Sequence, residues 1–294
     1  MRVVRHVAGS LMSRLRGIPR SAPRIGLALG GGFARGIAHA GVLEVFEKNR
    51  IPIHCITGVS AGAIAAAAYA SGVAPGELAR AACRMRFGDV SRWTLCRMGF
   101  LASERMKRFL ERLLHRHRFE EMRIPLGVLA TDLCAGQPVA FRDQGDVFLP
   151  IRASCAYPGL FLPVHHENRL LVDGAITMEI PAQLARQLGA THVISVYLPA
   201  QSEALPPRHV FEVVNRCFQI LHKRTEEGWR AASDLVITPD VRAISWDGLG
   251  CGPELLRAGE EAAMAAIPRI EAWLGRRAAR ATDAAVLAAS SVRA

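Results

Sequence analysis

The sequence predicts an α/β fold with a largely parallel sheet, and the order of its apolar segments is the main reason. From Pro23 onward, short apolar runs typical of buried strands alternate with segments of helical periodicity. Half of the 294 residues are hydrophobic and 21% are charged, which provides ample material for a core. Because no internal repeat or low-complexity linker interrupts this order, we expect one domain over residues 24–282, after a segment 1–23 and before a tail 283–294.

The expected strands and helices follow in chain order. "RIGLAL" (24–29) predicts a buried strand, which leads through a glycine loop into a helix that ends near Asn49. "IHCITGV" (53–59) predicts a second strand, followed directly by the alanine-rich helix "SAGAIAAAAYASG". Further strands are expected in apolar runs bounded by polar or turn residues, namely "PLGVLATDL", "QPVAF", "THVISVYL" and "DLVITPD". Helices are expected in "IPAQLARQLGA" and over residues 253–281.

Residues 77–118 interrupt the alternation and carry eleven Arg or Lys side chains against four acidic ones. The pattern predicts helices throughout this segment, with an apolar face formed by Met106, Phe109, Leu110, Leu113 and Leu114. The segment is either a cap over a site, offering cations to anionic headgroups, or an arginine-rich helix pair in solvent.

The chain as a whole is basic, with a net charge of +11. A surface of this sign favours phosphates, whether in lipid headgroups or in nucleic acid. Aromatic side chains make up only 6% of the residues and are not interleaved with the basic stretches, so nucleic-acid binding is not expected. The expected partner is an anionic membrane surface.

The first 43 residues contain no Asp or Glu, and residues 1–23 are expected to form either a basic amphipathic helix or a disordered tail. The apolar stripe of such a helix consists of Val4, Val7, Leu11, Leu15 and Ile18. No apolar run is long enough to cross a bilayer, and seven cysteines without a CxxC pair argue against a disulfide framework or a cysteine zinc site. The predicted location is the cytoplasm, peripheral at the membrane, with a transit peptide as the open alternative.

The glycine loop "GGGFARG" (30–36) is typical of an anion-binding turn between a strand and a helix. A P-loop is excluded because Gly36 is followed by Ile37 and Ala38 rather than by Lys and Ser or Thr. A dinucleotide fingerprint is excluded because no register places glycine at all three positions and no acid ends the second strand.

The motif "GVSAG" (58–62) places Ser60 between a strand and a helix, as a nucleophile turn requires. Gly58 and Gly62 permit the sharp turn, and the N-terminus of the helix favours developing negative charge. Parallel strands end at the same edge of a sheet. We therefore expect the amides of Gly31, Gly32 and their neighbours to face the oxyanion that forms when Ser60 attacks a carbonyl.

A base for Ser60 is harder to place. His192 begins a strand and is expected at the sheet edge opposite the site. The other histidines considered are expected in helices or exposed loops, namely His39, His165, His166, His209 and His222. Two carboxylates are better placed, since Asp173 in "LLVDGAI" and Asp132 in "LATDL" both end strands.

The motifs "GGFARG", "GVSAG" and "DGA", in this order and with "RASCAYPGLFLPV" (152–164) before the last, resemble those of the patatin-like phospholipases. The resemblance spans about residues 24–240. It implies a three-layer fold with helices on both faces of a largely parallel sheet. It also implies a Ser60–Asp173 dyad without histidine and an oxyanion hole at the glycine loop, formed by Gly31, Gly32, Phe33, Arg35 and Gly36. No metal or cofactor is expected, because no ligand spacing occurs and the nucleophile is a serine.

The activity implied by the resemblance is hydrolysis of lipid acyl esters, of phospholipase A or lysophospholipase type, through an acyl-enzyme. The alternatives are a lipid transacylase, in which only the final acceptor differs, and a nonenzymatic membrane-binding protein on the same fold. The chain departs from the family pattern at Phe33, which stands in place of the third glycine and could not keep a glycine-only dihedral. Arg35 is expected to bond loop carbonyls rather than a headgroup phosphate.

Overall fold

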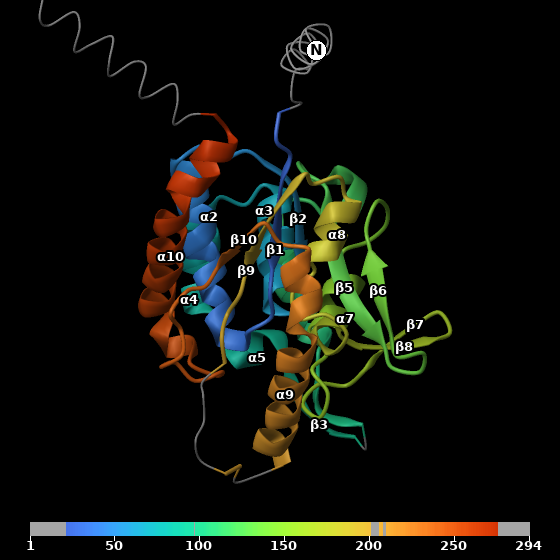
Figure 1. Cartoon of the computed structure of the whole chain (residues 1–294). Helices are drawn as coiled ribbons and strands as arrows, with labels where there is room; N and C mark the ends of the chain where they lie inside the picture. Colours follow the sequence, from blue (N-terminus) through green and yellow to red (C-terminus); the bar gives the residue numbers. More distant parts are fainter. Residues whose placement is uncertain (1–21, 97, 201–205, 208–209, 276–294) are drawn as a thin grey trace, which may run out of the picture.

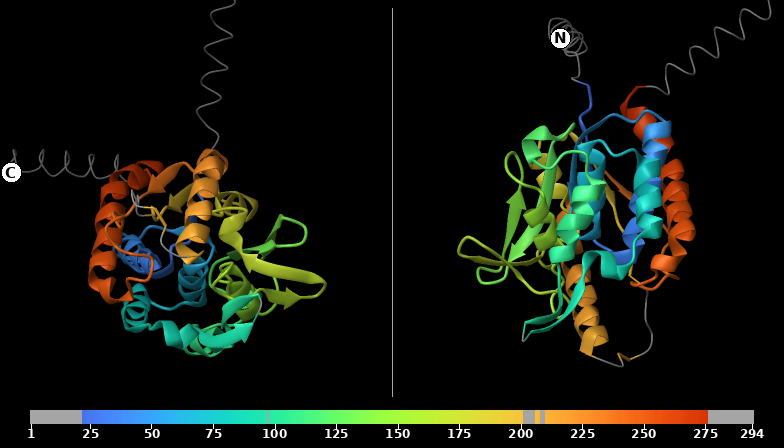
Figure 2. Two further views of the ribbon diagram at one scale, coloured as in Figure 1. Left: turned by 90° about the horizontal axis from the view of Figure 1, so that it is seen from below. Right: turned by 180° about the vertical axis from the view of Figure 1, so that it is seen from behind.

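A sheet between two layers of helices forms the body of the protein (Figure 1, Figure 2). The computed structural model describes residues 22–96, 98–200, 206–207 and 210–275. Except for Ala22 and Pro23, the segments expected over 1–23 and 283–294 lie outside the described residues. Within the described ranges, no helix is both long and apolar enough to span a membrane.

The main sheet of the described chain has the strand order β10-β9-β1-β2-β5-β8-β7, with β6 paired to β5. The strands from β10 to β5 run parallel, whereas β6, β7 and β8 are antiparallel to their neighbours. The prediction of a largely parallel sheet is confirmed. The bounds are β1 (Ile25–Leu29), β2 (Ile53–Gly58), β5 (Leu126–Asp132), β6 (Gln137–Phe141), β7 (Val164–His166), β8 (Arg169–Asp173), β9 (His192–Val196) and β10 (Leu235–Ile237).

The alternation of side chains along β1 shows how the sheet separates two cores. Ile25, Leu27 and Leu29 pack into the larger core, whereas Ala28 faces the smaller one on the opposite side. The helices of the larger core are α2 (Ala38–Lys48), α3 (Ala61–Ser71), α4 (Pro75–Arg84) and α10 (Gly252–Trp273), joined by α6 (Glu104–Leu113) and α7 (Phe148–Ser154). Helices α8 (Ala182–Gln187) and α9 (Val210–Ala231) cover the other face. The expected three-layer arrangement is thus confirmed.

The prediction of helices throughout 77–118 is wrong. Between α4 and α6 the chain forms a short helix, α5 (Phe87–Val90), and an antiparallel hairpin of β3 (Arg92–Cys96) and β4 (Gly99–Ala102). The hairpin contains Trp93, Thr94 and Phe100, which favour extended backbone over helix. The predicted apolar face is confirmed in part, because Met106, Leu110 and Leu113 of α6 are buried.

Two further expectations need correction. The last helix ends at Trp273 and not at residue 281, because Gly275 takes a left-handed φ of 70° that terminates the helix. His165 and His166, expected in a loop, form the edge strand β7 with Val164. The sheet places the carboxyl ends of β1 and β2 side by side, with Leu29 opposite Gly58, and the loops that follow these two strands build the site.

Candidate active site

Ser60 occupies a strained turn between β2 and α3. Its φ of 54° and ψ of −125° lie in a region that residues other than glycine rarely adopt. The backbone N–H of Ser60 donates to Oγ of Ser154 on α7 over 2.8 Å, which helps to hold the turn. The strain points the Ser60 side chain out of the sheet edge at the start of a helix, as a nucleophile turn requires.

The glycines on either side of Ser60 are required by close packing. A Cβ at Gly58 would lie 2.3 Å from the carbonyl oxygen of Gly62. A Cβ at Gly62 would lie 2.4 Å from the carbonyl oxygen of Leu29, at the end of β1. Both contacts are with backbone atoms, so neither can be relieved by moving a side chain. The turn can therefore close only with glycine at both positions.

Asp173 is brought to Ser60 by the end of β8 and is 1% exposed. Its Oδ1 accepts the amide of Ala175 over 2.9 Å, whereas Oδ2 accepts no hydrogen bond of normal geometry from any described residue. Burial raises the pKa of Asp173 to about 7, and the Ala175 amide and the Ser60 hydroxyl partly oppose this rise. Asp173 is thus a buried carboxylate that lies beside the serine hydroxyl with one oxygen free to accept a proton.

The competing carboxylate, Asp132, has another role. It ends β5, and its Oδ1 accepts the amides of Cys134 and Ala135 over 3.0 and 3.2 Å, which closes the turn into β6. It lines neither of the two pockets that contain Ser60.

The glycine loop passes directly beside the serine. A Cβ at Gly31 would lie 3.4 Å from the Cβ of Ser60. The amides of Gly31 and Gly32 donate to no acceptor within the described part of the chain, so both are available to an oxyanion.

The other expected loop residues differ in position. The amide of Arg35 donates to the carbonyl of Gly32, and its guanidinium donates to the carbonyl of Pro199 over 2.9 Å, as expected for a residue that bonds loop carbonyls. Gly36 lies behind the loop, where its missing Cβ allows a close approach to Ala61. Of Arg35 and Gly36, only Arg35 lines a pocket that also contains Ser60.

Phe33 takes a backbone conformation that favours glycine. Its φ of 50° is left-handed, a strained value for a bulky side chain. The ring packs edge-on against Tyr157 and Trp246, with ring centroids 4.9 and 5.2 Å apart. No sequence pattern indicates this aromatic cluster, because Tyr157 and Trp246 are far from Phe33 along the chain.

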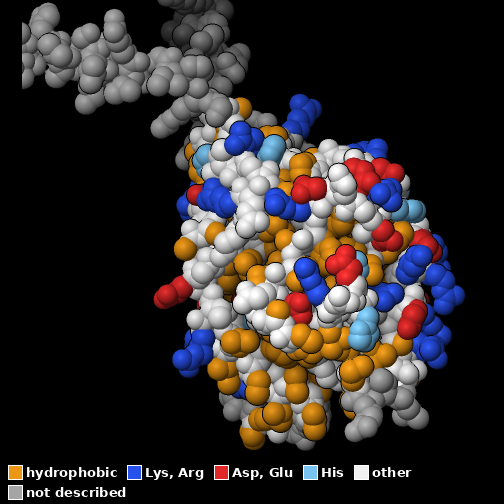
Figure 3. Space-filling view, turned by 90° about the vertical axis from the view of Figure 1, so that its right-hand side faces the viewer, with side chains coloured by type: hydrophobic (Ala, Val, Ile, Leu, Met, Phe, Trp, Pro, Cys, Tyr) orange, Lys and Arg blue, Asp and Glu red, His pale blue; other side chains and the backbone are white. Residues whose placement is uncertain are grey.

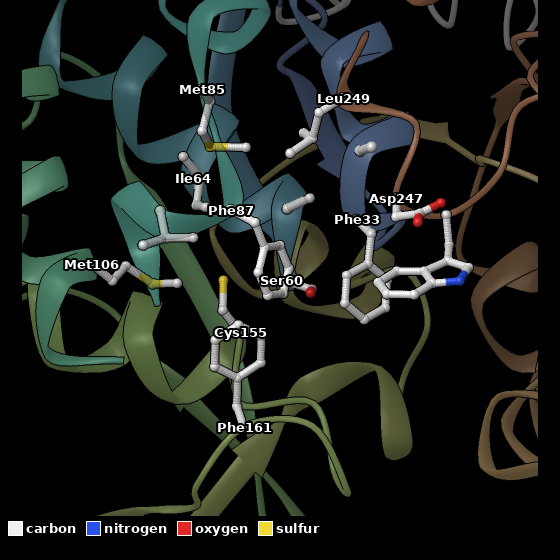
Figure 4. Close-up of a pocket in the computed structure, with 14 residues that line it drawn as sticks. Phe33, Ser60, Ile64, Met85, Phe87, Met106, Cys155, Phe161, Asp247 and Leu249 are labelled. Carbon is white, nitrogen blue, oxygen red and sulfur yellow. The ribbon is translucent and has the colours of Figure 1, made fainter. Parts of the chain in front are cut away.

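Ser60 lies on the wall of two pockets of different character. The first is almost entirely apolar and is shown in Figure 4, with the hydroxyl of Ser60 among hydrophobic side chains. Its apolar walls come from six separate parts of the chain, through Phe33, Ile64, Met85, Phe87, Met106, Phe161 and Trp246. The buried thiol of Cys155 lies beside Ser60 on this side, and burial raises the pKa of Cys155 well above its usual value.

The second pocket is more polar and contains both Ser60 and Asp173. Beside them lie Glu179 and His222, with Glu179 Oε1 3.5 Å from His222 Nδ1. Burial and the nearby Glu226 raise the pKa of Glu179 to about 7, against the opposing effects of Trp229 and the nearby arginines. Burial lowers the pKa of His222. His222 is on a helix, as expected, but the sequence could not show that this helix turns it into the pocket.

Among the described histidines, only His222 lines a pocket that contains Ser60. His39 is fully buried on α2, with Nε2 2.8 Å from the carbonyl oxygen of Gly30, and burial lowers its pKa to about 4. His192 begins β9 at the opposite edge of the sheet, as predicted. His209 lies outside the described residues. No group of three or more His, Cys, Asp or Glu that could hold a metal ion occurs in the ranges that the structure describes.

Residues 27–186 match the family model of the patatin-like phospholipases, which is more than half of the chain. The chain belongs to the patatin-like phospholipase family. An uncharacterized NTE family protein of Mycobacterium tuberculosis is 35% identical over 198 residues, which are 66% of this chain and 54% of that protein. The lysophospholipase NTE1 of Mycosarcoma maydis is 27% identical over 226 residues, which are 74% of this chain and 12% of that protein. The chain spans about half the length, or less, of the curated relatives it matches.

Two solved structures of bacterial proteins match the chain at low sequence identity. VipD from Legionella pneumophila matches with a TM-score of 0.44 and 13% identity, over 81% of this chain and 67% of that one. The type III effector protein ExoU matches with a TM-score of 0.45 and 13% identity, over 85% of this chain and 53% of that one.

Proposed function

We propose that this patatin-like chain is a serine hydrolase of lipid acyl esters, with Ser60 as nucleophile and Asp173 as base. One observation carries the proposal. The side chain of Ser60 lies on the wall of an apolar pocket and beside a buried carboxylate with a free oxygen. The pocket suits an acyl chain, and the carboxylate suits the proton that the serine must lose when it attacks an ester.

The reaction has two acyl-transfer steps. In the first, Oδ2 of Asp173 accepts the Ser60 proton while Oγ bonds to the ester carbonyl carbon, and the amides of Gly31 and Gly32 donate to the oxyanion. Collapse of this intermediate breaks the ester bond, and the leaving alcohol takes the proton from Asp173. In the second step, Asp173 takes a proton from water, the hydroxide attacks the acyl carbon, and the fatty acid leaves as Ser60 regains its proton.

Burial compensates for the weakness of a carboxylate as a base. A pKa of about 7 brings Asp173 closer to the serine hydroxyl in basicity than an exposed aspartate. The same pKa leaves a large fraction of Asp173 ionised at neutral pH. A histidine is then not required between the two residues.

The two pockets suggest how the substrate lies. The acyl chain occupies the apolar pocket between Ile64, Met106 and Phe161, and the alcohol lies in the polar pocket beside Glu179 and His222. The ester carbonyl then lies over Ser60, where both pockets meet. A phospholipase A or lysophospholipase activity fits this arrangement, and the name of the Mycosarcoma maydis relative agrees with it.

A phospholipid substrate places the enzyme at a membrane. We propose that it acts in the cytoplasm as a peripheral enzyme on anionic bilayers. The exposed arginines of the α4–α6 region support this, since each basic side chain near an anionic surface contributes about 1 kcal/mol of attraction.

A panel of acyl lipids, offered to the wild type and to Ser60→Ala, tests the proposal. We expect free fatty acid from the wild type and none above background from Ser60→Ala. Acyl groups found on an added alcohol or lipid instead of water would indicate a transacylase. Binding of vesicles without release or transfer of any acyl group would favour the nonenzymatic alternative and contradict the proposal.

A further inference from the structure

Large hydrophobic side chains are exposed on the hairpin β3–β4, near the opening of the site. Trp93 is 76% exposed, Phe100 55% and Met98 52%. Figure 3 shows hydrophobic side chains gathered at the lower end of the molecule, the end to which the hairpin and the adjoining end of α9 project in Figure 1. A contiguous exposed apolar patch at one end of a molecule marks an interaction surface.

Helix α9 is apolar on two faces. Phe211, Val214 and Phe218 pack inward against the core cluster beside the site. Val210 and Val213, on the outer side, are 78% and 46% exposed. The solvent-exposed face of a surface helix normally carries polar residues. The start of α9 therefore presents a second apolar surface with no cover among the described residues.

The loop over residues 159–161, which lines the site, contacts both the hairpin and α9. The amides of Phe100 and Leu101 donate to the carbonyl of Leu160 over 3.1 and 3.0 Å. The neighbouring Gly159 lies against Val214 of α9. Phe161, the next residue after Leu160, lines the apolar pocket. Viewed from below, the hairpin and α9 lie on opposite sides of this end of the molecule (Figure 2). We call Trp93, Met98, Phe100, Val210 and Val213 the apolar rim.

Basic side chains are in excess in the segments that flank the hairpin along the chain. Between residues 84 and 112, Arg97 aside, the exposed basic side chains are Arg84, Arg86, Arg92, Arg105, Lys107, Arg108 and Arg112. The exposed acidic side chains in the same range are Asp89, Glu104 and Glu111. An apolar edge with an excess of arginine behind it complements a bilayer whose headgroups are anionic.

We infer that the apolar rim is the surface by which the protein enters an anionic lipid bilayer, with the site opening between its two parts. Trp93 and Phe100 lie at the level where aromatic rings are favoured in membranes, and the arginines of α6 contact headgroup phosphates. A lipid leaving the bilayer then meets apolar surface from the rim to the pocket. This inference rests on the proposed function in one respect, that the substrate is a bilayer lipid.

The test compares the full chain with rim variants. Trp93→Ser/Phe100→Ser and Val210→Ser/Val213→Ser each remove one part of the rim, and Met264→Ser, 52% exposed on α10, is the matched control. Binding is measured by co-sedimentation with vesicles of phosphatidylglycerol and phosphatidylcholine. We expect each rim variant to lose about 10-fold or more in partition, since two buried side chains are lost, and Met264→Ser to bind as the wild type. All variants are expected to cleave a soluble short-chain ester equally, because no rim residue lines either pocket.

The outcomes separate this inference from the proposed function. Unchanged vesicle binding by both rim variants would overturn the inference. If the substitutions only converted a dimer into a monomer in gel filtration, the rim would be a contact between two copies of the chain, which would also overturn it. If deletion of residues 1–20 alone abolished binding, the rim would not be the docking surface. Rim-dependent binding by a protein that cleaves no ester would instead contradict the proposed function alone.

A fluorescence measurement covers the case in which the serine variants do not fold. Trp93→Phe keeps an aromatic ring and is expected to bind vesicles as well as the wild type does. The blue shift of tryptophan emission that vesicles cause in the wild type should be largely lost in this variant. An undiminished shift would mean that Trp93 stays in water, which the inference excludes.

Discussion

The hydroxyl of Ser60 lies beside the buried carboxylate of Asp173 and lowers its pKa, against the larger rise that burial causes. The two side chains reach this position from different directions. Ser60 follows the parallel strand β2, whereas Asp173 ends the antiparallel strand β8. The raised pKa of Asp173 affects both the pH dependence of the reaction and the pH dependence of the free energy of unfolding.

The rate of ester hydrolysis should rise with pH around neutrality. Asp173 accepts a proton only when ionised, and its pKa is raised to about 7, so kcat/KM should increase through this range and level off above it. A pH–rate profile on a soluble ester measures this midpoint. A profile already flat from about pH 5 upward would mean that a carboxylate with an ordinary pKa is the base.

Asp173→Asn should make the folded protein more stable at alkaline pH. The folded-state pKa of Asp173 is raised, so the folded protein binds more protons than the unfolded chain between about pH 4 and pH 7, and stability falls across this window as pH rises. An asparagine side chain does not ionise, so the variant should gain up to about 4 kcal/mol over the wild type at about pH 8 and much less near pH 4. Denaturant unfolding at the two pH values measures the difference. If Asp173→Asn were less stable than the wild type at both pH values, ionisation of the buried Asp173 would not destabilise the fold, contrary to the prediction.

Gly58→Ala should destabilise the protein strongly. The added methyl would lie 2.3 Å from the carbonyl oxygen of Gly62, and the backbone around Ser60 would have to move, at a cost of about 3 kcal/mol or more. Gly88→Ala on α5 is the matched control, because a Cβ there meets nothing within 4 Å. Thermal unfolding of both variants measures the effect. Equal melting temperatures would show that the turn is looser than its contacts indicate.

The position of Ser60 could be predicted because its motif has a local context, whereas the residues alone left Asp132 and Asp173 open and the family resemblance chose Asp173. The strand, the turn and the helix around Ser60 follow one another directly in the sequence. The pockets could not be predicted in this way, since Met85, Phe161 and Trp246 meet only in the folded chain. His222 shows the same limit, because a helical pattern does not show which helical face reaches a site.

The hairpin β3–β4 was missed for a different reason. Its basic and apolar residues fit a helical period about as well as an extended one, and its hydrogen bonds to Leu160 come from a distant segment. At Phe33 the sequence showed the departure from glycine but not its consequence. The residue adopts a left-handed φ, and its ring packs against Tyr157 and Trp246.

Ile64→Trp should shift the enzyme toward short acyl chains. Ile64 lines the apolar pocket, so a larger ring there takes space that a long acyl chain would occupy and a short one would not need. We expect kcat/KM for long-chain esters to fall about 10-fold or more, with little change for acetate or butyrate esters. Met264→Trp on the surface of α10 is the control. An equal loss on all chain lengths would mean that the acyl chain does not lie in this pocket.

The most direct test of the account compares Ser60→Ala, Asp173→Asn and the double variant in the hydrolysis of one soluble ester, with Asp132→Asn as the control carboxylate. Because both residues serve the same acyl-transfer step, we expect each single variant to lose about 1,000-fold or more in kcat and the double variant to lose no more than the singles. Asp132→Asn should retain activity, since its carboxylate closes the turn after β5, lies 4.0 Å from Nε of Arg169 and lines neither pocket that contains Ser60. If Asp173→Asn kept most of the wild-type rate while Ser60→Ala did not, Asp173 would not be the base and the dyad would be wrong.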